Sequence, residues 1–325
     1  MLVPLLKALK KQGKVTIIST SPFKAHEVFN GFEHQLFDRI VELEGNIDML
    51  KHSASFRKKF DAVYLDYFAA THKNLMLAHI VSKKVITNHL PIKLPLLFRK
   101  RVEKRKPLVG VHEAVQYLKF AHPEFEEQQL NDQHFSLNAK KGAFEGTTSR
   151  YITIQPGSGN NLTPWKTWKL EYWIEVIQWI LDHTECVILV LGDDSELKLA
   201  EKLPDHERII TLIGQTSLQD LPGIIQGAAI HLGQDSGLMH IAGCVGTKTI
   251  TIWGGSDPEH FGWEKINSEK HTILKRKLSC QPCNRWIAPN TNKVELSSLC
   301  PDFACLAEIK PEEFIKVLEE KFNAC

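Results

Sequence analysis

Residues 151–161 spell YITIQPGSGNN, a short apolar run followed by a glycine-rich loop. β-branched and aromatic side chains favour a strand over Tyr151–Ile154, and the glycines after it predict a turn. The same order recurs through the second half of the chain, where each apolar run is followed by a polar loop and then by an amphipathic segment. This alternation predicts β-α-β units and therefore a parallel, doubly wound α/β sheet.

The other predicted strands of this half are nearly continuous in apolar residues, which is typical of strands covered on both faces. Between them, Trp168–His183 spaces its apolar residues as one face of a helix. Pro311–Phe322 is predicted to form a last amphipathic helix, with its proline in the first turn. The strands are Cys186–Leu191, Arg208–Leu212, Ala229–Gly233 and Thr249–Trp253, and the apolar face is Trp173, Val176, Ile177, Ile180 and Leu181.

The first half is less regular but predicts a second α/β layer. The polar stretch Asn131–Arg150 is predicted to link the two, giving domains over residues 1–145 and 146–325. A chain of 325 residues has the length of about two domains. The predicted helices are Val3–Lys11 and His112–Phe120, and the predicted strands are Val15–Ser19, Ala62–Leu65 and Lys84–Thr87.

Composition narrows the functional class. With 40 basic and 38 acidic side chains the net charge is only +2, so overall charge gives no argument for a nucleic-acid partner. No run approaches the ~20 apolar residues of a membrane span. At the start of the chain, the apolar run before the first lysine residues is too short for a signal peptide. Seven cysteines, an odd number, fit a reducing compartment, so a cytoplasmic location is expected.

Two glycine-containing loops are candidate phosphate sites. Gly157 and Ser158 follow a strand, and Lys166 precedes a helix, where a cation and free N–H groups can meet an anion. No G-K-[ST] ending is present, so this is not a Walker motif, and an ordinary turn with a solvated lysine remains an alternative. Residues 233–240, GQDSGLMH, predict a second strand-to-helix turn.

In that second turn Asp235 is expected near the helix N-cap, with the amides of Ser236 and Gly237 available to a phosphate. His240 follows one helical turn later, where it can face the same ligand. A capped helix with a packed histidine is the plainer alternative. A hydrolase with Ser236 as nucleophile and His240 as base is a weak alternative, because the G-x-S-x-G pattern is absent.

Two more loops follow predicted strands. In the first, Glu196 can accept hydrogen bonds from ribose hydroxyls, although Asp193 and Asp194 fit better as acids at a helix N-terminus. In the second, residues 253–260 spell WGGSDPEH and can border a ligand. Loops that follow parallel strands share one edge of the sheet, so together the four predict a nucleotide site with bound phosphates.

Two further segments have open interpretations. Cys280, Cys283, Cys300 and Cys305 are compatible with a structural zinc site, with free thiols, which we favour, or with a disulfide. Residues 83–106 contain nine Lys or Arg and one acid, which suits an anionic membrane surface, an anionic acceptor or a solvated basic face. The candidate contacts of this patch are Lys93, Arg99, Lys100 and Arg101.

Taken together, these motifs resemble glycosyltransferase family 9, the lipopolysaccharide heptosyltransferases. Residues 235–242, DSGLMHIA, resemble its D-[ST]-G-x-x-H-x-A signature, and residues 254–258, GGSDP, resemble its G-x-[ST]-D-P loop. Pro156-Gly157-Ser158 with Lys166 and Trp168 resembles its P-G-[AS]…K-x-W element, with a longer spacer. The four cysteines resemble a pattern in members similar to heptosyltransferase II.

The resemblance implies a GT-B fold, with two Rossmann-like doubly wound domains facing across a cleft. It implies inverting, metal-independent transfer of heptose from ADP-heptose, bound by the C-terminal domain, to lipopolysaccharide inner core, bound by the N-terminal domain. The acceptor would place the enzyme at the inner membrane as a peripheral protein. The donor-binding residues it implies are Gly157, Ser158, Lys166, Glu196, Asp235, Ser236, Gly237, Leu238 and His240, with Lys166 and Asp235 also catalytic.

The start of the chain departs from the family pattern. Family members begin with a strand and a Gly-Asp turn that carries the proposed general base, whereas residues 1–6, MLVPLL, resemble the helix after that turn. The first strand is therefore expected to be missing, and Asp66 is the substitute base that we name. Either a working transferase has a misassigned or truncated start, or the chain is a nucleotide-sugar-binding protein with impaired catalysis.

Overall fold

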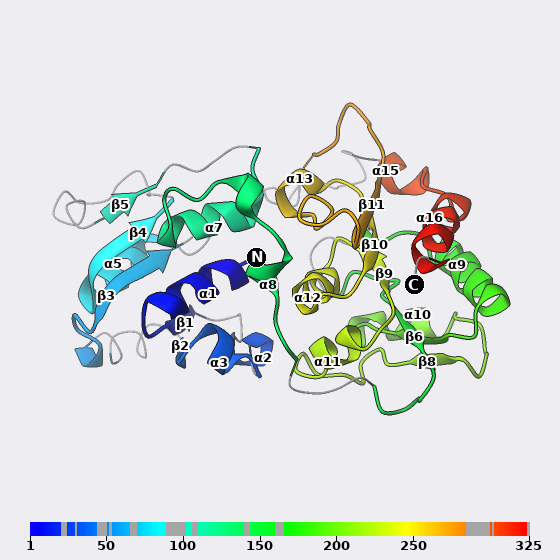
Figure 1. The fold of residues 1–325 in the computed structure, drawn as a ribbon, viewed down its shortest axis with the longest axis horizontal. Helices are drawn as coiled ribbons and strands as arrows, with labels where there is room; N and C mark the ends of the chain where they lie inside the picture. Colours follow the sequence, from blue (N-terminus) through cyan, green and yellow to red (C-terminus); the bar gives the residue numbers. More distant parts are fainter. Residues whose placement is uncertain are drawn as a thin grey trace. The chain divides into compact units, whose positions relative to one another are not determined.

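A computed structural model describes residues 1–20, 25–29, 31–43, 51, 54–65, 70–88, 102–105, 110–139, 144–159, 166–283, 300 and 302–323 (Figure 1). Two compact units divide the chain, Met1–Leu130 and Asn131–Cys325. Each is an α/β unit whose described strands are all parallel. This agrees with the predicted fold class.

The second unit is built on one six-stranded sheet in the order β11-β10-β9-β6-β7-β8. Its strands are β6 (Tyr151–Ile154), β7 (Val187–Val190), β8 (Ile209–Thr211), β9 (His231–Gln234), β10 (Thr249–Trp253) and β11 (His271–Lys275). Its helices are α8 (Asp132–Phe135), α9 (Leu170–His183), η3 (Asp194–Glu196), α10 (Leu197–Ala200), α11 (Leu221–Gln226), α12 (Gly237–Val245), α13 (Pro258–Phe261), α15 (Ala304–Ala307) and α16 (Pro311–Asn323).

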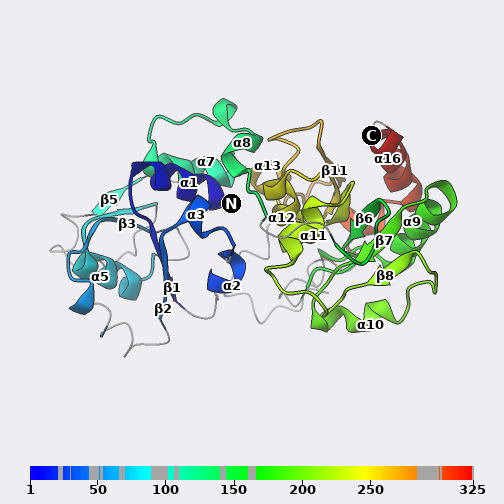
Figure 2. The same ribbon diagram turned by 60° about the horizontal axis from the view of Figure 1, so that its bottom comes forward.

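Helices cover both faces of this sheet (Figures 1 and 2). Ile152 and Ile154 face a core shared with α9 and α16, whereas Tyr151 faces a second core shared with α11 and α12. Because successive side chains of a strand point to opposite faces, a strand covered on both sides needs apolar residues at every position. The continuous apolar runs of the sequence are explained by this arrangement.

The helix α9 confirms the predicted apolar face. Its five predicted residues are buried, and Trp173, Val176, Ile177 and Ile180 are fully buried. Truncating a core tryptophan of this kind to alanine typically costs about 3–5 kcal/mol. The apolar stripe of α9 is therefore a main source of the packing of this unit.

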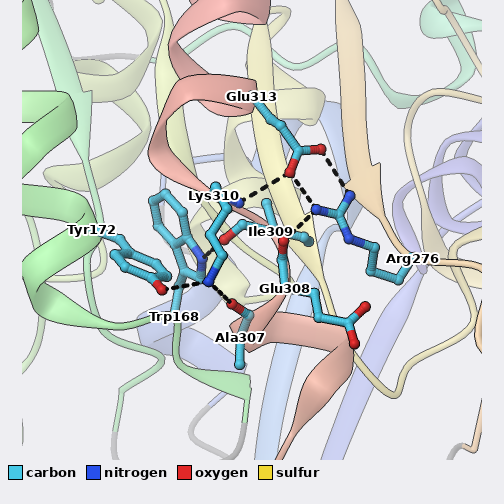
Figure 3. Close-up of polar contacts among 8 residues, drawn as sticks. All are labelled: Trp168, Tyr172, Arg276, Ala307, Glu308, Ile309, Lys310 and Glu313. Carbon is cyan, nitrogen blue, oxygen red and sulfur yellow. Dashed lines mark hydrogen bonds and ion pairs between the residues drawn. The ribbon is translucent and has the colours of Figure 1, made fainter.

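Polar contacts attach the C-terminal helix to the same core (Figure 3). The indole N–H of Trp168 donates to the carbonyl oxygen of Ile309 at 3.0 Å. Lys310 Nζ donates to the Tyr172 hydroxyl at 2.8 Å and to the Ala307 carbonyl at 3.0 Å. Arg276, which directly follows β11, forms two contacts with the Glu313 carboxylate of α16, one of them at 2.9 Å. The start of α16 and the residue before it are thus joined to α9 and to the end of β11.

The first unit contains two separate parallel sheets, β1–β2 and β3–β4–β5. The helices α1 and α7 pack together on β3 and β4 through Leu5, Ile86, Tyr117 and Phe120. Its elements are α1 (Val3–Gln12), β1 (Thr16–Thr20), α2 (Ala25–Phe29), α3 (Glu33–Leu36), β2 (Arg39–Leu43), β3 (Phe60–Leu65), α5 (His72–Val81), β4 (Ser82–Thr87), β5 (Val102–Lys104), α7 (Glu113–Ala121) and η1 (Glu127–Gln129).

All predicted strands are present within a few residues. The strands β2, β5 and β11, the helix α5 and the short helices α2, α3, α8, α10, α13 and α15 are not among the predictions. The division between units falls after Leu130, earlier than the predicted boundary after residue 145. The reason is that α8 already packs on the second unit: the ring of Phe135 lies 4.5 Å from that of Trp263, and Asn267 donates to Asp132 at 2.7 Å. No helix in the described parts of the chain has the length and apolar character to cross a bilayer.

Two buried histidines begin strands of the second sheet and pair with threonines on the neighbouring strands. His231 Nδ1 lies 3.0 Å from Thr153 Oγ1, and His271 Nδ1 lies 3.0 Å from Thr249 Oγ1. Burial lowers the pKa of His231 to about 3 and, mainly for the same reason, that of His271 to about 4. Both side chains are therefore neutral in the folded protein at neutral pH.

These depressed pKa values predict that acid destabilises the second unit. Between pH 6.5 and about 4 the unfolded chain binds protons that the folded histidines do not, so stability falls as the pH falls. Each histidine is expected to contribute on the order of 1 kcal/mol per pH unit. Denaturant unfolding measured from pH 7 to pH 5 tests this, and His271→Gln should flatten the pH dependence.

The exposed His206 supplies the matched control, and His206→Gln should leave the slope unchanged. An unaltered slope in His271→Gln would contradict the assignment.

Candidate functional site

Four loops with the predicted functional residues follow β6, β7, β9 and β10. Because these strands are parallel neighbours or next neighbours in one sheet, their loops all lie at its carboxyl edge. The predicted convergence of the four loops is therefore confirmed.

The side chain of Gln234, at the end of β9, connects three parts of this edge. It is fully buried, and its Nε2 donates to the carbonyl oxygens of Pro156 at 2.9 Å and Gly157 at 2.7 Å. Its Oε1 accepts from the backbone N–H of Trp168 at 2.5 Å. One amide thus fixes the loop after β6 against both β9 and the segment that leads into α9.

Lys166 and Asp235 form an ion pair across this edge. Their side chains are only 13% and 9% exposed, so the pair is screened little by solvent. Lys166 is therefore not a solvated lysine in an ordinary turn. Asp235 lies near the N-cap of α12 as predicted, one residue before the N-cap residue Ser236. Its carboxylate pairs with Lys166, and no capping bond to a helix N–H is seen in the described part of the chain.

The N-terminus of α12 has an open approach. Ser236 Oγ donates to Gln155 Oε1 at 2.5 Å, which turns its hydroxyl away from the helix amides. Gly237 is exposed, and apart from its chain neighbours and the backbone of its own helix no described atom lies within 4 Å of where a Cβ would be. Backbone N–H groups at such a terminus attract an anion through hydrogen bonding and the helix dipole.

Glu196 lies beneath the loop after β6. Burial raises the pKa of its carboxyl, while the backbone amides of Gly159 and Asp193 lower it. A Cβ on Gly157 would lie 1.6 Å from Glu196 Oε1, and one on Gly192 would lie 2.6 Å from Oε2. Both glycines are therefore needed to leave space for this carboxylate.

The neighbouring acid Asp193 has the capping role expected for it. Its carboxylate accepts from the backbone N–H of Ser195 at 2.9 Å at the start of η3. Ser158, by contrast, lies inside the loop after β6, where its hydroxyl is 3.1 Å from that of Thr167.

His240 lies on α12, one turn after Gly237. Its Nδ1 accepts a hydrogen bond from Trp263 Nε1 at 3.1 Å, and its pKa is lowered to about 3, mainly by desolvation. Ser236 is bonded to Gln155 rather than to His240. A hydrolase that uses Ser236 as nucleophile and His240 as base is therefore not supported, because the two side chains are not paired.

The fourth loop brings a buried hydroxyl and two thiols to the same edge. Ser256 is 2% exposed, and its Oγ has no hydrogen-bond partner among the residues that the structure describes. Cys283 Sγ lies 3.6 Å from the carbonyl oxygen of Gly255, and Cys305 is buried beside Gly254. Cys280 is exposed and Cys300 partly exposed; within the described ranges no three His, Cys, Asp or Glu residues are placed to bind a metal.

Five predicted site residues lie outside the described residues. They are the candidate base Asp66 and the candidate acceptor or membrane contacts Lys93, Arg99, Lys100 and Arg101.

Sequence reasoning missed Gln155 and Gln234. The signal for both is their position at the carboxyl end of a strand. Gln155 directly follows β6, and Gln234 is the last residue of β9. The sequence motifs consist of groups that can bind a ligand, whereas these amides bind the protein's own backbone and side chains.

This is an α/β protein whose parallel sheet has glycine loops, an ion pair and an open helix N-terminus at its carboxyl edge. Folds of this class bind their ligands at that edge. Residues 94–293 match the family model of glycosyltransferase family 9 (heptosyltransferase), which is more than half of the chain. The chain therefore belongs to glycosyltransferase family 9.

Individual relatives are distant. Lipopolysaccharide heptosyltransferase 1 of Escherichia coli (strain K12) is 24% identical over 181 residues, which covers 56% of this chain and 50% of that protein. The chain thus matches about half the length of this relative. Lipooligosaccharide heptosyltransferase 2 of Campylobacter jejuni (serotype O:6) is 22% identical and covers 98% of this chain and 92% of that protein.

Solved structures agree in fold. A glycosyl transferase family 9 protein from Veillonella parvula has a TM-score of 0.71 at 16% identity, covering 100% of this chain and 93% of that chain. ADP-heptose LPS heptosyltransferase II of E. coli has a TM-score of 0.68 at 16% identity, covering 99% and 94%. The fold is GT-B, with two Rossmann-like units.

The contact between Gly157 and Glu196 gives a direct test of the site's packing. Gly157→Ala should lower the free energy of unfolding by about 1–3 kcal/mol, because the new methyl group overlaps the buried carboxylate. In a Glu196→Ala background the same change should cost clearly less. Denaturant unfolding of the two single variants and the double variant measures this coupling. Strictly additive effects would mean that the two residues do not interact.

Proposed function

We propose that this protein transfers a heptose from ADP-heptose to the inner core of lipopolysaccharide, with inversion and without a metal ion. The observation that carries the proposal is the buried ion pair of Lys166 and Asp235 beside the open N-terminus of α12. Family membership and the names of the relatives support the choice of reaction and substrates.

In this proposal the second unit binds the nucleotide. A diphosphate brings negative charge to the α12 terminus, where the amides of Ser236, Gly237 and Leu238 and the ammonium of Lys166 would stabilise it. Such fixed donors act most strongly when they are aimed at charge that develops in the transition state, here on the departing diphosphate. Asp235 would orient Lys166, and Ser158 would contact a phosphate oxygen.

Glu196 and His240 would complete the donor site. Glu196 lies against Gly157 in the loop after β6, and at this edge of the sheet its carboxylate would accept a hydrogen bond from a ribose hydroxyl. His240 would contact the phosphate or the sugar, and Gly157 would allow close approach of the backbone.

The first unit would bind the acceptor, and Asp66 would take the proton from the attacking hydroxyl as general base. Lys93, Arg99, Lys100 and Arg101 would contact the anionic acceptor or the membrane surface. We infer from these roles a cytoplasmic protein that associates peripherally with the inner membrane. The alternative is a nucleotide-sugar-binding protein that lacks an effective base.

Calorimetry with ADP tests the donor site. Lys166→Ala should weaken ADP binding by about tenfold or more, since a charge-assisted hydrogen bond contributes about 1.5–3 kcal/mol. Lys169→Ala, which removes an exposed charge nearby, should change the affinity less than twofold. Absence of binding to ADP and to other nucleoside diphosphates in the wild type would remove the donor-site proposal.

An assay of ADP release distinguishes the proposed transferase from the alternative, a nucleotide-sugar-binding protein without catalysis. With ADP-heptose and a lipopolysaccharide core acceptor, the wild type should release ADP, and Asp66→Asn should lower kcat by about 10²–10⁴-fold, the range for a general base. ADP affinity should stay unchanged in this variant. ADP binding without any turnover in the wild type would favour the alternative.

A further inference from the structure

The hydrogen bond between Trp263 and His240 determines which ring nitrogen of the histidine carries the proton. An indole N–H can only donate. Because Trp263 Nε1 lies 3.1 Å from His240 Nδ1, that nitrogen must be the unprotonated acceptor. A neutral imidazole has one N–H, so the hydrogen is on Nε2.

Packing prevents the indole from moving away. Trp263 is 1% exposed, and its ring lies 4.5 Å from that of Phe135 and 5.5 Å from that of His271. A Cβ on Gly243 would lie 2.2 Å from the indole, so the backbone of α12 packs directly against the ring and leaves no space for a side chain at this position. Gly243 is one turn beyond His240 on the same helix, and the two positions share a face. The ring of Trp263 therefore has one position relative to His240.

The pKa of His240 is lowered to about 3, mainly by desolvation, and nearby charges have smaller effects. His240 is therefore neutral at every pH near neutrality. Its side chain is partly exposed, and within the described part of the chain its Nε2 has no hydrogen-bond partner.

We infer that Trp263 is a positioning residue that keeps His240 in the Nε2–H form, as a neutral hydrogen-bond donor to an oxygen of the bound nucleotide sugar. This inference rests on the proposed function, which places that ligand at α12. It assigns His240 no part as a base or as a cation. The acceptor oxygen belongs either to the diphosphate or to a sugar hydroxyl, and the two share this chemistry.

Long-range ¹H–¹⁵N NMR of the imidazole nitrogens tests the assignment in the ligand-free protein. The wild type should show the Nε2–H tautomer of His240 at pH 7. Trp263→Phe keeps an aromatic ring but removes the donor, so the two tautomers should mix and an Nδ1–H form should appear beside the Nε2–H form. A wild-type Nδ1–H form, or a spectrum unchanged in Trp263→Phe, would overturn the inference.

Kinetics supply the functional readout. Trp263→Phe should lower kcat/KM for ADP-heptose about tenfold, the effect expected from losing one aligned hydrogen bond in a buried site. The mixed tautomers of His240 and the lower kcat/KM are then the two readouts of this variant. Trp179→Phe is the matched control, because Trp179 stacks on His183 at 4.7 Å but on α9, away from the four loops, and it should change neither readout.

A second pair of variants does not depend on replacing a core residue. His240→Gln can place an amide N–H near the former Nε2, whereas His240→Asn places its amide near the former Nδ1. Gln should therefore retain more activity than Asn, and equal losses would contradict a donor role of Nε2. If the wild type has no turnover at all, the proposed function fails, while the NMR result still decides the tautomer.

Discussion

The buried amide of Gln234 is the constraint on which the functional edge depends. It lies in a fully buried position, where each unpaired polar group would cost about 1–3 kcal/mol. Both its N–H groups and its oxygen have partners, and these come from the loop after β6 and from the segment before α9. The loop that carries Gly157 and Ser158 is thus fixed by β9, the strand that also positions Asp235 and α12.

The same edge contains several groups that favour function over stability. A buried ion pair such as Lys166–Asp235 loses most of its Coulomb gain to desolvation. Burial raises the pKa of the Glu196 carboxyl. A core built only for stability would use apolar side chains at these positions. Their concentration at the carboxyl ends of four strands, where parallel sheets bind ligands, supports a ligand-binding role for all of them.

Much of the second unit is encoded locally. Apolar runs such as Tyr151–Ile154 and the periodic face of α9 predict strands and helix correctly, because burial on both faces imposes patterns visible over a few residues. The prediction misses β11, whose short sequence HTILK holds only two apolar residues and lies at the edge of the sheet. It also misses β2 and α5, although Gly45-Asn46 follows β2 and Thr71 caps the start of α5. In each case the pattern of polar and apolar residues is too short or too mixed to predict the secondary structure by itself.

The site shows the same division between local and tertiary information. Spacing in DSGLMH correctly brings His240 one turn into a helix at the loop edge, because helical geometry is local. The partner of each side chain is not local: Asp235 pairs with Lys166 instead of capping its own helix, and His240 bonds to Trp263 instead of Ser236. Which partner wins depends on packing between segments far apart in sequence, such as Gly243 against the Trp263 ring. A motif can therefore specify where a functional residue lies, whereas its protonation state is set by residues that the motif does not contain.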